Sequence, residues 1–247
     1  MLGDCLKLMK DIPDNSIDMC LTDPPYGTTQ CKWDSVIDFK LMWEQLKRIV
    51  KDNGAICLFG SEPLSSRLRL SNIKMFKYDW IWEKHHKTGH LNAKKRPMKK
   101  CELISVFYER QPRYTPQGLI DCNKNMLNSK SHSLRTKDNA TSTVSGGLTR
   151  KPYKQLKTNY PVELLKFNSC NGNLSHPTQK PFALLEYLIK TYTLENETVL
   201  DFTMGSGSTG VACHNLKRKF IGIEQDDKYF KIARQRIEDH AAQGKFL

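Results

Sequence analysis

The sequence predicts an α/β protein with a mostly parallel sheet, and three observations support this. Apolar runs of strand length alternate with segments whose apolar residues recur at helical spacing. Polar or glycine-rich segments directly follow two of these runs, beginning at Asp23 and Gly205. The chain has 247 residues, enough for one α/β domain with an insertion. Because parallel strands place their carboxyl ends at one edge of a sheet, a ligand is expected to bind there.

The first part of the chain predicts a β-α-β unit followed by two further strands. The apolar run over 17–22 ends at two successive prolines, which cannot continue a hydrogen-bond ladder, so a buried strand is expected to stop there. Asn53-Gly54 is expected to close the helix that follows. The expected elements are a short helix over 4–15, the strand over 17–22, a helix over 41–50, a strand over 55–60, a weak basic helix over 65–71, and strands over 78–84 and 101–108.

Regular elements are expected to resume at Pro181, after a long polar stretch. From Gln111 to about Ser175 the chain is rich in Asn, Ser, Thr, Lys and Gly and has no useful periodicity, which predicts a functional or mobile insertion. The elements expected beyond it are a helix over 181–189, a strand over 198–201, a helix opened by the glycine segment 205–210, a strand over 220–224, and a basic amphipathic helix over 228–240.

The segment Asp23-Pro24-Pro25-Tyr26 predicts a site for a planar amine. Its prolines fix the backbone and remove two N–H donors, while the Asp23 carboxylate adds an acceptor. Converging acceptors suit an exocyclic amino group, and the Tyr26 ring can lie against the flat ring that carries it. We call these four residues the amine clamp. A proline-rich loop with a capping aspartate and a core tyrosine is the alternative, and the tetrapeptide alone leaves both open.

A second pattern predicts a site for an adenosine-bearing ligand. Gly205, Gly207 and Gly210 match G-x-G-x-x-G between an expected strand and an expected helix. Glu224 ends the next strand, where its carboxylate can accept hydrogen bonds from ribose hydroxyls. The pattern suits NAD as well as S-adenosylmethionine. No Gly-Lys-Ser/Thr follows, which disfavours hydrolysis of a nucleoside triphosphate.

The segment from His176 to Pro181 precedes an expected helix. Free N–H groups at the start of that helix, together with Thr178 and Lys180, predict an anion site suited to an amino-acid carboxylate. The alternative is a well-capped helix start without a ligand.

The positive charge of the chain is concentrated in one segment. Net charge is +13, and residues 84–160 hold 17 Lys+Arg against 4 Asp+Glu, so the rest of the chain is neutral overall. Such a segment, with interspersed aromatic residues, favours contact with nucleic-acid phosphates over a merely solvated basic loop. Three histidines between 85 and 90 lack a carboxylate or thiolate at ligand spacing, so no metal is expected. The candidate DNA contacts are Lys32, Trp33, Lys94, Lys95, Arg96, Lys99 and Lys100.

The cysteines and the hydropathy pattern favour a cytoplasmic protein. The eight cysteines include no C-x-x-C pair, and most fall in apolar runs, so reduced core thiols are expected. The amino terminus lacks the pattern of a signal peptide, and no apolar run approaches the ~18 residues of a membrane span.

Taken together, the motifs resemble the β group of amino-methylating DNA methyltransferases that use S-adenosylmethionine. The resemblance covers most of the chain and depends on the order of four segments. These are Gly3-Asp4-Cys5-Leu6, Leu21 to Tyr26, His176 to Pro181, and Asp201 to Gly210 followed by Glu224. It implies a circularly permuted motif order and a seven-stranded mixed sheet, six strands parallel and one antiparallel, with helices on both faces. The implied divisions are a catalytic half over 1–110, a target-recognition insertion over 111–175 and a cofactor-binding half over 176–247.

The resemblance also implies a role for each motif residue. Asp23 and the Pro24 carbonyl would accept the two amino hydrogens, and Tyr26 would stack on a base swung out of the duplex. Asp201 would brace the glycine loop, Glu224 would hold the ribose, and Asp4 would lie near the adenine. His176, Thr178 and Lys180 would hold the methionine end of the cofactor. The full set implied for the cofactor is Asp4, Cys5, His176, Thr178, Lys180, Asp201, Phe202, Gly205, Ser206, Gly207 and Glu224.

The expected activity is methylation of adenine N6 in double-stranded DNA, in the cytoplasm of a bacterium or a phage-infected cell. An aspartate in the first clamp position is similar to the adenine enzymes, whereas cytosine-N4 enzymes more often carry serine. Alternatives are a cytosine-N4 methyltransferase, a NAD-dependent oxidoreductase and a catalytically inactive nucleic-acid-binding module. An RNA substrate, a homodimer and a restriction endonuclease partner also stay open. Two features depart from the family: only Met1 and Leu2 precede the first motif, which predicts a shortened sheet edge, and Phe202-Thr203 replaces Pro-Phe after Asp201.

Overall fold

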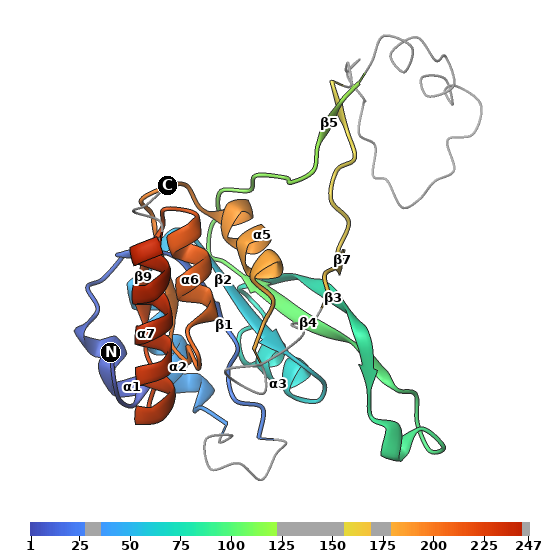
Figure 1. Ribbon diagram of the computed structural model, residues 1–247, viewed down its shortest axis with the longest axis horizontal. Helices are drawn as coiled ribbons and strands as arrows, with labels where there is room; N and C mark the ends of the chain where they lie inside the picture. Colours follow the sequence, from blue (N-terminus) through green and yellow to red (C-terminus); the bar gives the residue numbers. More distant parts are fainter. Residues whose placement is uncertain (28–35, 123–155, 169–178, 244–247) are drawn as a thin grey trace. The chain divides into compact units, whose positions relative to one another are not determined.

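The computed structural model describes residues 1–27, 36–122, 156–168 and 179–243 (Figure 1). It divides into two units. The larger comprises Met1–Thr115 with Val162–Leu247, and the smaller is Pro116–Pro161. Of the range 111–175 that is expected to form the target-recognition insertion, 111–115 and 162–168 therefore belong to the larger unit.

A seven-stranded sheet forms the centre of the larger unit, with the order β7-β3-β4-β2-β1-β8-β9. Strand β4 is antiparallel to both of its neighbours, and all other pairs are parallel, which confirms the expected mixed sheet. Its strands are β1 (Ile17–Thr22), β2 (Val50–Gly60), β3 (Phe76–Thr88), β4 (Lys99–Phe107), β7 (Leu164–Lys166), β8 (Thr198–Asp201) and β9 (Lys219–Gly222).

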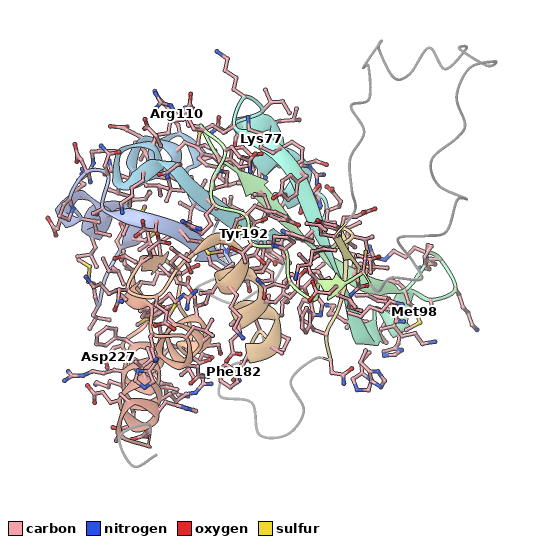
Figure 2. All side chains as sticks on the ribbon, turned by 90° about the horizontal axis from the view of Figure 1, so that it is seen from above. Lys77, Met98, Arg110, Phe182, Tyr192 and Asp227 are labelled. Atoms are coloured by element: carbon pink, nitrogen blue, oxygen red, sulfur yellow. The ribbon has the colours of Figure 1, made fainter. Side chains whose placement is uncertain are left out.

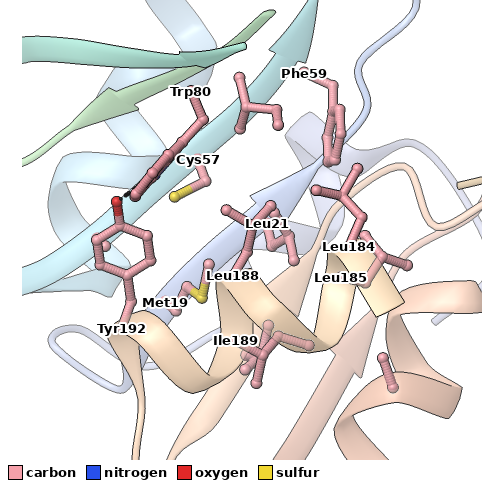
Figure 3. Packing of buried hydrophobic residues seen from close by; sticks show 14 of the residues in the cluster. Met19, Leu21, Cys57, Phe59, Trp80, Leu184, Leu185, Leu188, Ile189 and Tyr192 are labelled. Carbon is pink, nitrogen blue, oxygen red and sulfur yellow. Dashed lines mark hydrogen bonds between the residues drawn. The ribbon is translucent and has the colours of Figure 1, made fainter. Parts of the chain in front are cut away.

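Helices cover both faces of this sheet, as expected. The elements are α1 (Cys5–Leu8), η1 (Met9–Asp11), α2 (Phe39–Ile49), α3 (Leu64–Ser71), η2 (His90–Asn92), α5 (Phe182–Tyr192), α6 (Ser208–Asn215) and α7 (Asp227–Gln243). Met19 and Leu21 of β1 pack with α5 on one face (Figure 3), whereas Cys20 packs with α2 on the other. Because both faces are buried, the central strands appear in the sequence as continuous apolar runs.

Strands β3 and β4 form a long hairpin that extends beyond the rest of the sheet (Figure 1). Ile81 and Gly60 both pair with Leu103, so β3 continues to Thr88 past the end of β2. Met98 marks this part of the molecule in Figure 2. Residues 85–100 had been expected to form a linker between shorter strands, whereas β3 continues to Thr88 and β4 begins at Lys99, so the connection is confined to 89–98. The strands are extended because ion pairs between them, such as Lys100 with Glu83 at 2.6 Å, continue the pairing of polar side chains.

Two local expectations also need correction. The first helix is shorter than 4–15, because it ends in a 3-10 turn at Asp11, ahead of Pro13. Helix α2 ends at Ile49, and Asn53-Gly54 lie inside β2 rather than closing the helix. A Cβ at Gly54 would lie 3.0 Å from the Asp18 carbonyl oxygen, and the β1–β2 register shifts at this point. Gly54 is therefore needed for a close approach of two strands.

In its described residues, the smaller unit contains a short antiparallel pair, β5 (Ile120–Asp121) with β6 (Lys157–Thr158). Lys157 and Asp121 are paired across it at 2.6 Å.

At the opposite edge of the large sheet from β7, Leu2 makes an isolated parallel bridge to Glu224. Among the described helices, none has the length and apolarity needed to cross a membrane.

Candidate active site

A cavity of about 370 Å³ opens at the carboxyl edge of the sheet. The amine clamp after β1 and the glycine segment after β8 both line it. Residues from the amino terminus, from the segment 36–38 before α2, from the end of β2, from the start of α5 and from the segment after β9 also line it. The structure therefore brings together two segments that lie about 180 residues apart in the sequence, as the parallel sheet predicts.

The clamp and the glycine segment are connected by hydrogen bonds, not only by proximity. Thr22 Oγ1 donates to Asp201 Oδ1 at 3.2 Å and accepts from the Phe202 N–H at 3.1 Å. Thr203 Oγ1 donates to the Asp23 carbonyl oxygen at 3.0 Å. These contacts fix the distance between the two halves of the cavity, so two ligands bound there can be held at a set separation.

Asp201 is the buried centre of the glycine loop. Its carboxylate accepts hydrogen bonds from Thr209 Oγ1 at 2.7 Å and from the Thr203 N–H at 3.2 Å. The side chain thereby contacts both the beginning of the loop and the helix α6 that follows it. Burial raises the pKa of Asp201 to about 7, although the hydrogen bonds oppose this shift.

Gly207 turns the chain into α6, and only glycine fits there. Its φ is +78°, in the left-handed region, and an added Cβ would lie 2.9 Å from the Ala233 Cβ and 3.0 Å from the Ala233 Cα of α7. Both the backbone conformation and the contact with α7 exclude a side chain. This glycine therefore lets α6 and α7 pack closely behind the loop.

Gly207→Ala is expected to lower the free energy of unfolding by about 2–4 kcal/mol, because backbone strain and a steric clash add together. Urea denaturation followed by circular dichroism measures this. Gly89→Ala is the matched control, since Gly89 also has a positive φ, of +96°, but no atom lies within 4 Å of its added Cβ. If both substitutions lower the free energy of unfolding equally, the steric clash with Ala233 does not contribute to the loss of stability.

Glu224 lies beyond the carboxyl end of β9 and faces the same loop. Its Oε2 accepts from the Gly205 N–H and its Oε1 from the Asp226 N–H, both at 2.9 Å. Burial raises the pKa of this carboxyl, and the backbone hydrogen bonds oppose the shift. Because a carboxylate oxygen can accept more than one hydrogen bond, both oxygens can still accept from ribose hydroxyls.

The remaining predicted cofactor residues form the wall around Glu224. Asp4 caps α1 by accepting from the Leu6 N–H at 2.9 Å, and Cys5 follows it. Burial raises the pKa of the Cys5 thiol to about 11, so it stays protonated and acts as an apolar surface. Phe202 is buried at the base of the cavity, and Ser206 lines it beside Gly205.

The Asp23 carboxylate is held at both oxygens. Tyr26 donates its hydroxyl hydrogen to Asp23 Oδ1 at 2.7 Å, and Lys180 Nζ donates to Oδ2. The Lys180 side chain is only 10% exposed and also lies 3.6 Å from Glu102 Oε2. Burial alone would lower the pKa of Lys180, but Asp23 and Glu102 outweigh it and raise the pKa. The ammonium group therefore stays charged between two carboxylates.

Sequence reasoning missed Glu102 and Lys84, which form the next ion pair along this edge, at 2.6 Å. The available signal was an acidic residue inside the apolar run expected as a strand over 101–108. Four of the predicted site residues lie outside the described residues, namely Lys32, Trp33, His176 and Thr178.

Comparison with known proteins connects this geometry to a family. A family model described as DNA methylase matches residues 17–235. The chain belongs to the DNA methylase family. Type II methyltransferase M2.LlaDCHI of Lactococcus lactis subsp. cremoris is 28% identical over 268 residues, which covers 98% of this chain and 90% of that protein. Type II methyltransferase M2.DpnII of Streptococcus pneumoniae is 27% identical, and the match covers 96% of this chain and 88% of that protein.

Solved structures show the same DNA methylase fold. The crystal structure of the M1.HpyAVI–SAM complex matches with a TM-score of 0.63 and 26% identity, covering 96% of this chain and 97% of that one. The cytosine-N4-specific PvuII DNA methyltransferase matches in fold, with a TM-score of 0.66 at 17% identity. The expected β-group amino-methylating DNA methyltransferase family is thereby confirmed. Membership in the family also decides between the two adenosine-bearing cofactors, in favour of S-adenosylmethionine over NAD.

Proposed function

We propose that this DNA methylase transfers a methyl group from S-adenosylmethionine to the N6 amine of an adenine that has been swung out of double-stranded DNA. The observation that supports this most is the shared cavity, in which Asp23 and the Gly205 loop are connected through Thr203. An acceptor for an amine and a loop for an adenosyl group are thus held at a fixed separation.

The charges that line the cavity suit a cationic cofactor. Among the described lining residues, Lys180 is the one basic side chain, whereas five are acidic: Asp4, Asp23, Asp38, Asp201 and Glu224. When bound, S-adenosylmethionine supplies a methyl group activated by a positively charged sulfur. Asp23 is paired with Lys180, and burial raises the pKa of Asp201 to about 7, so the excess negative charge comes from Asp4, Asp38 and Glu224. Opposite charges in a partly buried site attract, so these three carboxylates favour a sulfonium over a neutral or anionic ligand.

The amine clamp performs the chemistry by holding hydrogens. The lone pair of an adenine amino nitrogen is delocalised into the ring, and acceptors on both N–H hydrogens favour its localisation on nitrogen. Asp23 and the Pro24 carbonyl supply these acceptors, and they also stabilise the positive charge that develops on nitrogen during transfer. Stacking on Tyr26, at about 1–3 kcal/mol, offsets part of the cost of extruding the base. The Tyr26 hydroxyl orients the carboxylate.

Nucleoside analysis tests this function directly. Duplex DNA is incubated with the purified chain and a deuterated-methyl cofactor, digested to nucleosides and examined by mass spectrometry. Labelled N6-methyl-deoxyadenosine is the expected product. Labelled N4-methyl-deoxycytidine would replace the adenine assignment but keep the clamp, and transfer to RNA alone would replace the substrate. If no label enters any nucleic acid, the proposed function is wrong.

We further propose that the β3–β4 hairpin contacts the DNA backbone. Residues 84–100 hold seven Lys+Arg and no Asp or Glu. Lys94, Lys95 and Arg96 are exposed and form no ion pair with any carboxylate in the described part of the chain. By contrast, Lys100 is paired with Glu83, and Lys99 donates to Ser61 Oγ at 3.0 Å. Lys94, Lys95 and Arg96 are therefore available for contact with phosphates.

Replacing Lys94, Lys95 and Arg96 by Gln is expected to reduce the salt dependence of DNA affinity. Each lost phosphate contact lowers the slope of log K against log salt by about 0.9, so the triple variant should lose about 2.7. Fluorescence anisotropy with a labelled duplex at several salt concentrations measures this slope. The matched control replaces three exposed lysines outside the basic segment, Lys10, Lys47 and Lys219. Equal slopes for the two triple variants would exclude the hairpin as the contact.

A further inference from the structure

Glu102 is a buried carboxylate that none of the roles described above uses. It lies on β4, and its side chain is 17% exposed. Its Oε1 accepts a hydrogen bond from Lys84 Nζ of β3 at 2.6 Å. Its Oε2 has no hydrogen-bond partner within the described residues, and its nearest charged group is Lys180 Nζ at 3.6 Å. Burial opposes the charge on Glu102, but Lys180 and Lys84 outweigh it and lower the pKa, so this side chain stays a charged carboxylate beside the amine clamp.

The charged groups form an alternating row along the carboxyl edge of the sheet. In order, they are Lys84, Glu102, Lys180 and Asp23, and Tyr26 follows as the hydrogen-bond donor to Asp23. The Lys180 ammonium lies over the Phe59 ring of β2, with Nζ 5.0 Å from the ring centroid. The row thus crosses β3, β4, β2 and the end of β1. Each charged group lies next to a group of opposite charge, and the charges of the row sum to zero.

We propose that Glu102 is a positioning residue for methyl transfer, which holds the Lys180 ammonium so that the Asp23 carboxylate keeps one orientation and stays an acceptor. The inference rests on the proposed function, since it concerns the same clamp. Without Glu102, Asp23 would be the one carboxylate paired with Lys180 among the described residues, and the ammonium could follow Asp23 as that side chain moves. With Glu102 on its other side and the Phe59 ring beside it, the ammonium is fixed from three directions.

Neutralising Glu102 has an electrostatic consequence at the reacting nitrogen. The row would then carry a net positive charge next to the place where positive charge develops on the amine. Lys180 would also lose one of the two carboxylates that raise its pKa, while Asp23 and the Phe59 ring still contact it. The pKa of Lys180 would fall, so the ammonium would lose its proton at a lower pH than in the wild-type protein.

The test compares Glu102→Gln, Lys180→Met and the double variant in steady-state methylation of duplex DNA. Glu102→Gln is expected to lower kcat about ten-fold, the scale of a small misplacement of a catalytic group, and to change the Kd of S-adenosylmethionine less than two-fold. The double variant should be no slower than Lys180→Met, because Glu102 acts only through Lys180. The alkaline limb of the kcat–pH profile should lie at lower pH in Glu102→Gln.

Asp79→Asn is the matched control. Asp79 is also a partly buried carboxylate in the β3–β4 pair, but it contacts Arg69 and Ser105 instead of Lys180. Its substitution should affect melting temperature alone, which separates loss of stability from loss of positioning. The inference would be overturned by an unchanged kcat in Glu102→Gln. It would also be overturned if the fold-reduction in kcat of the double variant equalled the product of the two single reductions, or if the alkaline limb of the kcat–pH profile lay at the same pH in Glu102→Gln and in the wild type. A wild-type protein that transfers no methyl group would instead show that the proposed function is wrong.

Discussion

Asp23→Ala is expected to reduce kcat for methyl transfer about 100- to 1,000-fold, the range found when one preorganised polar contact to a transition state is removed. The Asp23 carboxylate is the charged acceptor of the clamp, and it is oriented from both sides by Tyr26 and Lys180. Alanine removes the acceptor and leaves a positive ammonium near the developing charge. Binding of S-adenosylmethionine, measured by titration calorimetry, should change little, because the glycine loop and Glu224 are untouched.

Asp18→Asn provides the control for this prediction. Asp18 lies on the same strand, β1, and is paired with Lys51 at 2.6 Å, away from the cavity. It should retain near wild-type kcat with some loss of stability. Substantial methylation by Asp23→Ala, in a preparation whose circular dichroism matches the wild type, would show that Asp23 does not hold the amine.

Glu224→Ala is expected to weaken binding of S-adenosylmethionine about 10- to 100-fold, because a hydrogen bond to a charged acceptor contributes about 1.5–3 kcal/mol. Glu224 has two roles that act together. Its carboxylate is placed to accept from ribose hydroxyls, and it also holds the Gly205 N–H at the start of the loop. Titration calorimetry measures the loss of affinity. At a saturating concentration of cofactor, the rate of methyl transfer should return close to that of the wild-type protein.

The neighbouring Asp226→Ala separates binding from folding. Asp226 Oδ1 accepts from the Tyr229 N–H at 3.0 Å near the start of α7, but its side chain does not line the cavity. Its loss should destabilise the helix start by about 1 kcal/mol and leave the cofactor Kd nearly unchanged. If both substitutions weaken cofactor binding equally, Glu224 acts on α7 and not on the cofactor.

Local patterns predicted most of the sheet. The strand over 17–22 and the strand over 198–201 appear with the expected limits, because both are buried on two faces, and two prolines end the first of them soon after Thr22. The predictions were wrong where residues typical of one structure occur in another. Asn53-Gly54 looked like a turn, but Gly54 serves a close contact between strands. The basic linker expected over 85–100 is shorter, because its first and last residues belong to β3 and β4.

The candidate site was predicted less completely than the sheet. Gly205, Glu224 and Asp23 carry recognisable spacing along the chain, and each lines the cavity. Lys180 was expected to hold the cofactor carboxylate, whereas in the structure it is paired with Asp23. Glu102 had no motif at all. Its position beside Lys180 depends on the pairing of β4 with β2, which no local pattern encodes.

The sequence alone determined which segments leave the sheet and what chemistry they carry, because prolines, glycines and apolar periodicity act through the nearest few residues. The tertiary structure decided which of those segments meet. Thr22 and Asp201 are 179 residues apart in the chain yet share a hydrogen bond, since β1 and β8 are neighbouring parallel strands. The ion pair of Asp23 was likewise decided by the tertiary structure, because Lys180 comes from a distant segment and its charge acts through space and not along the chain.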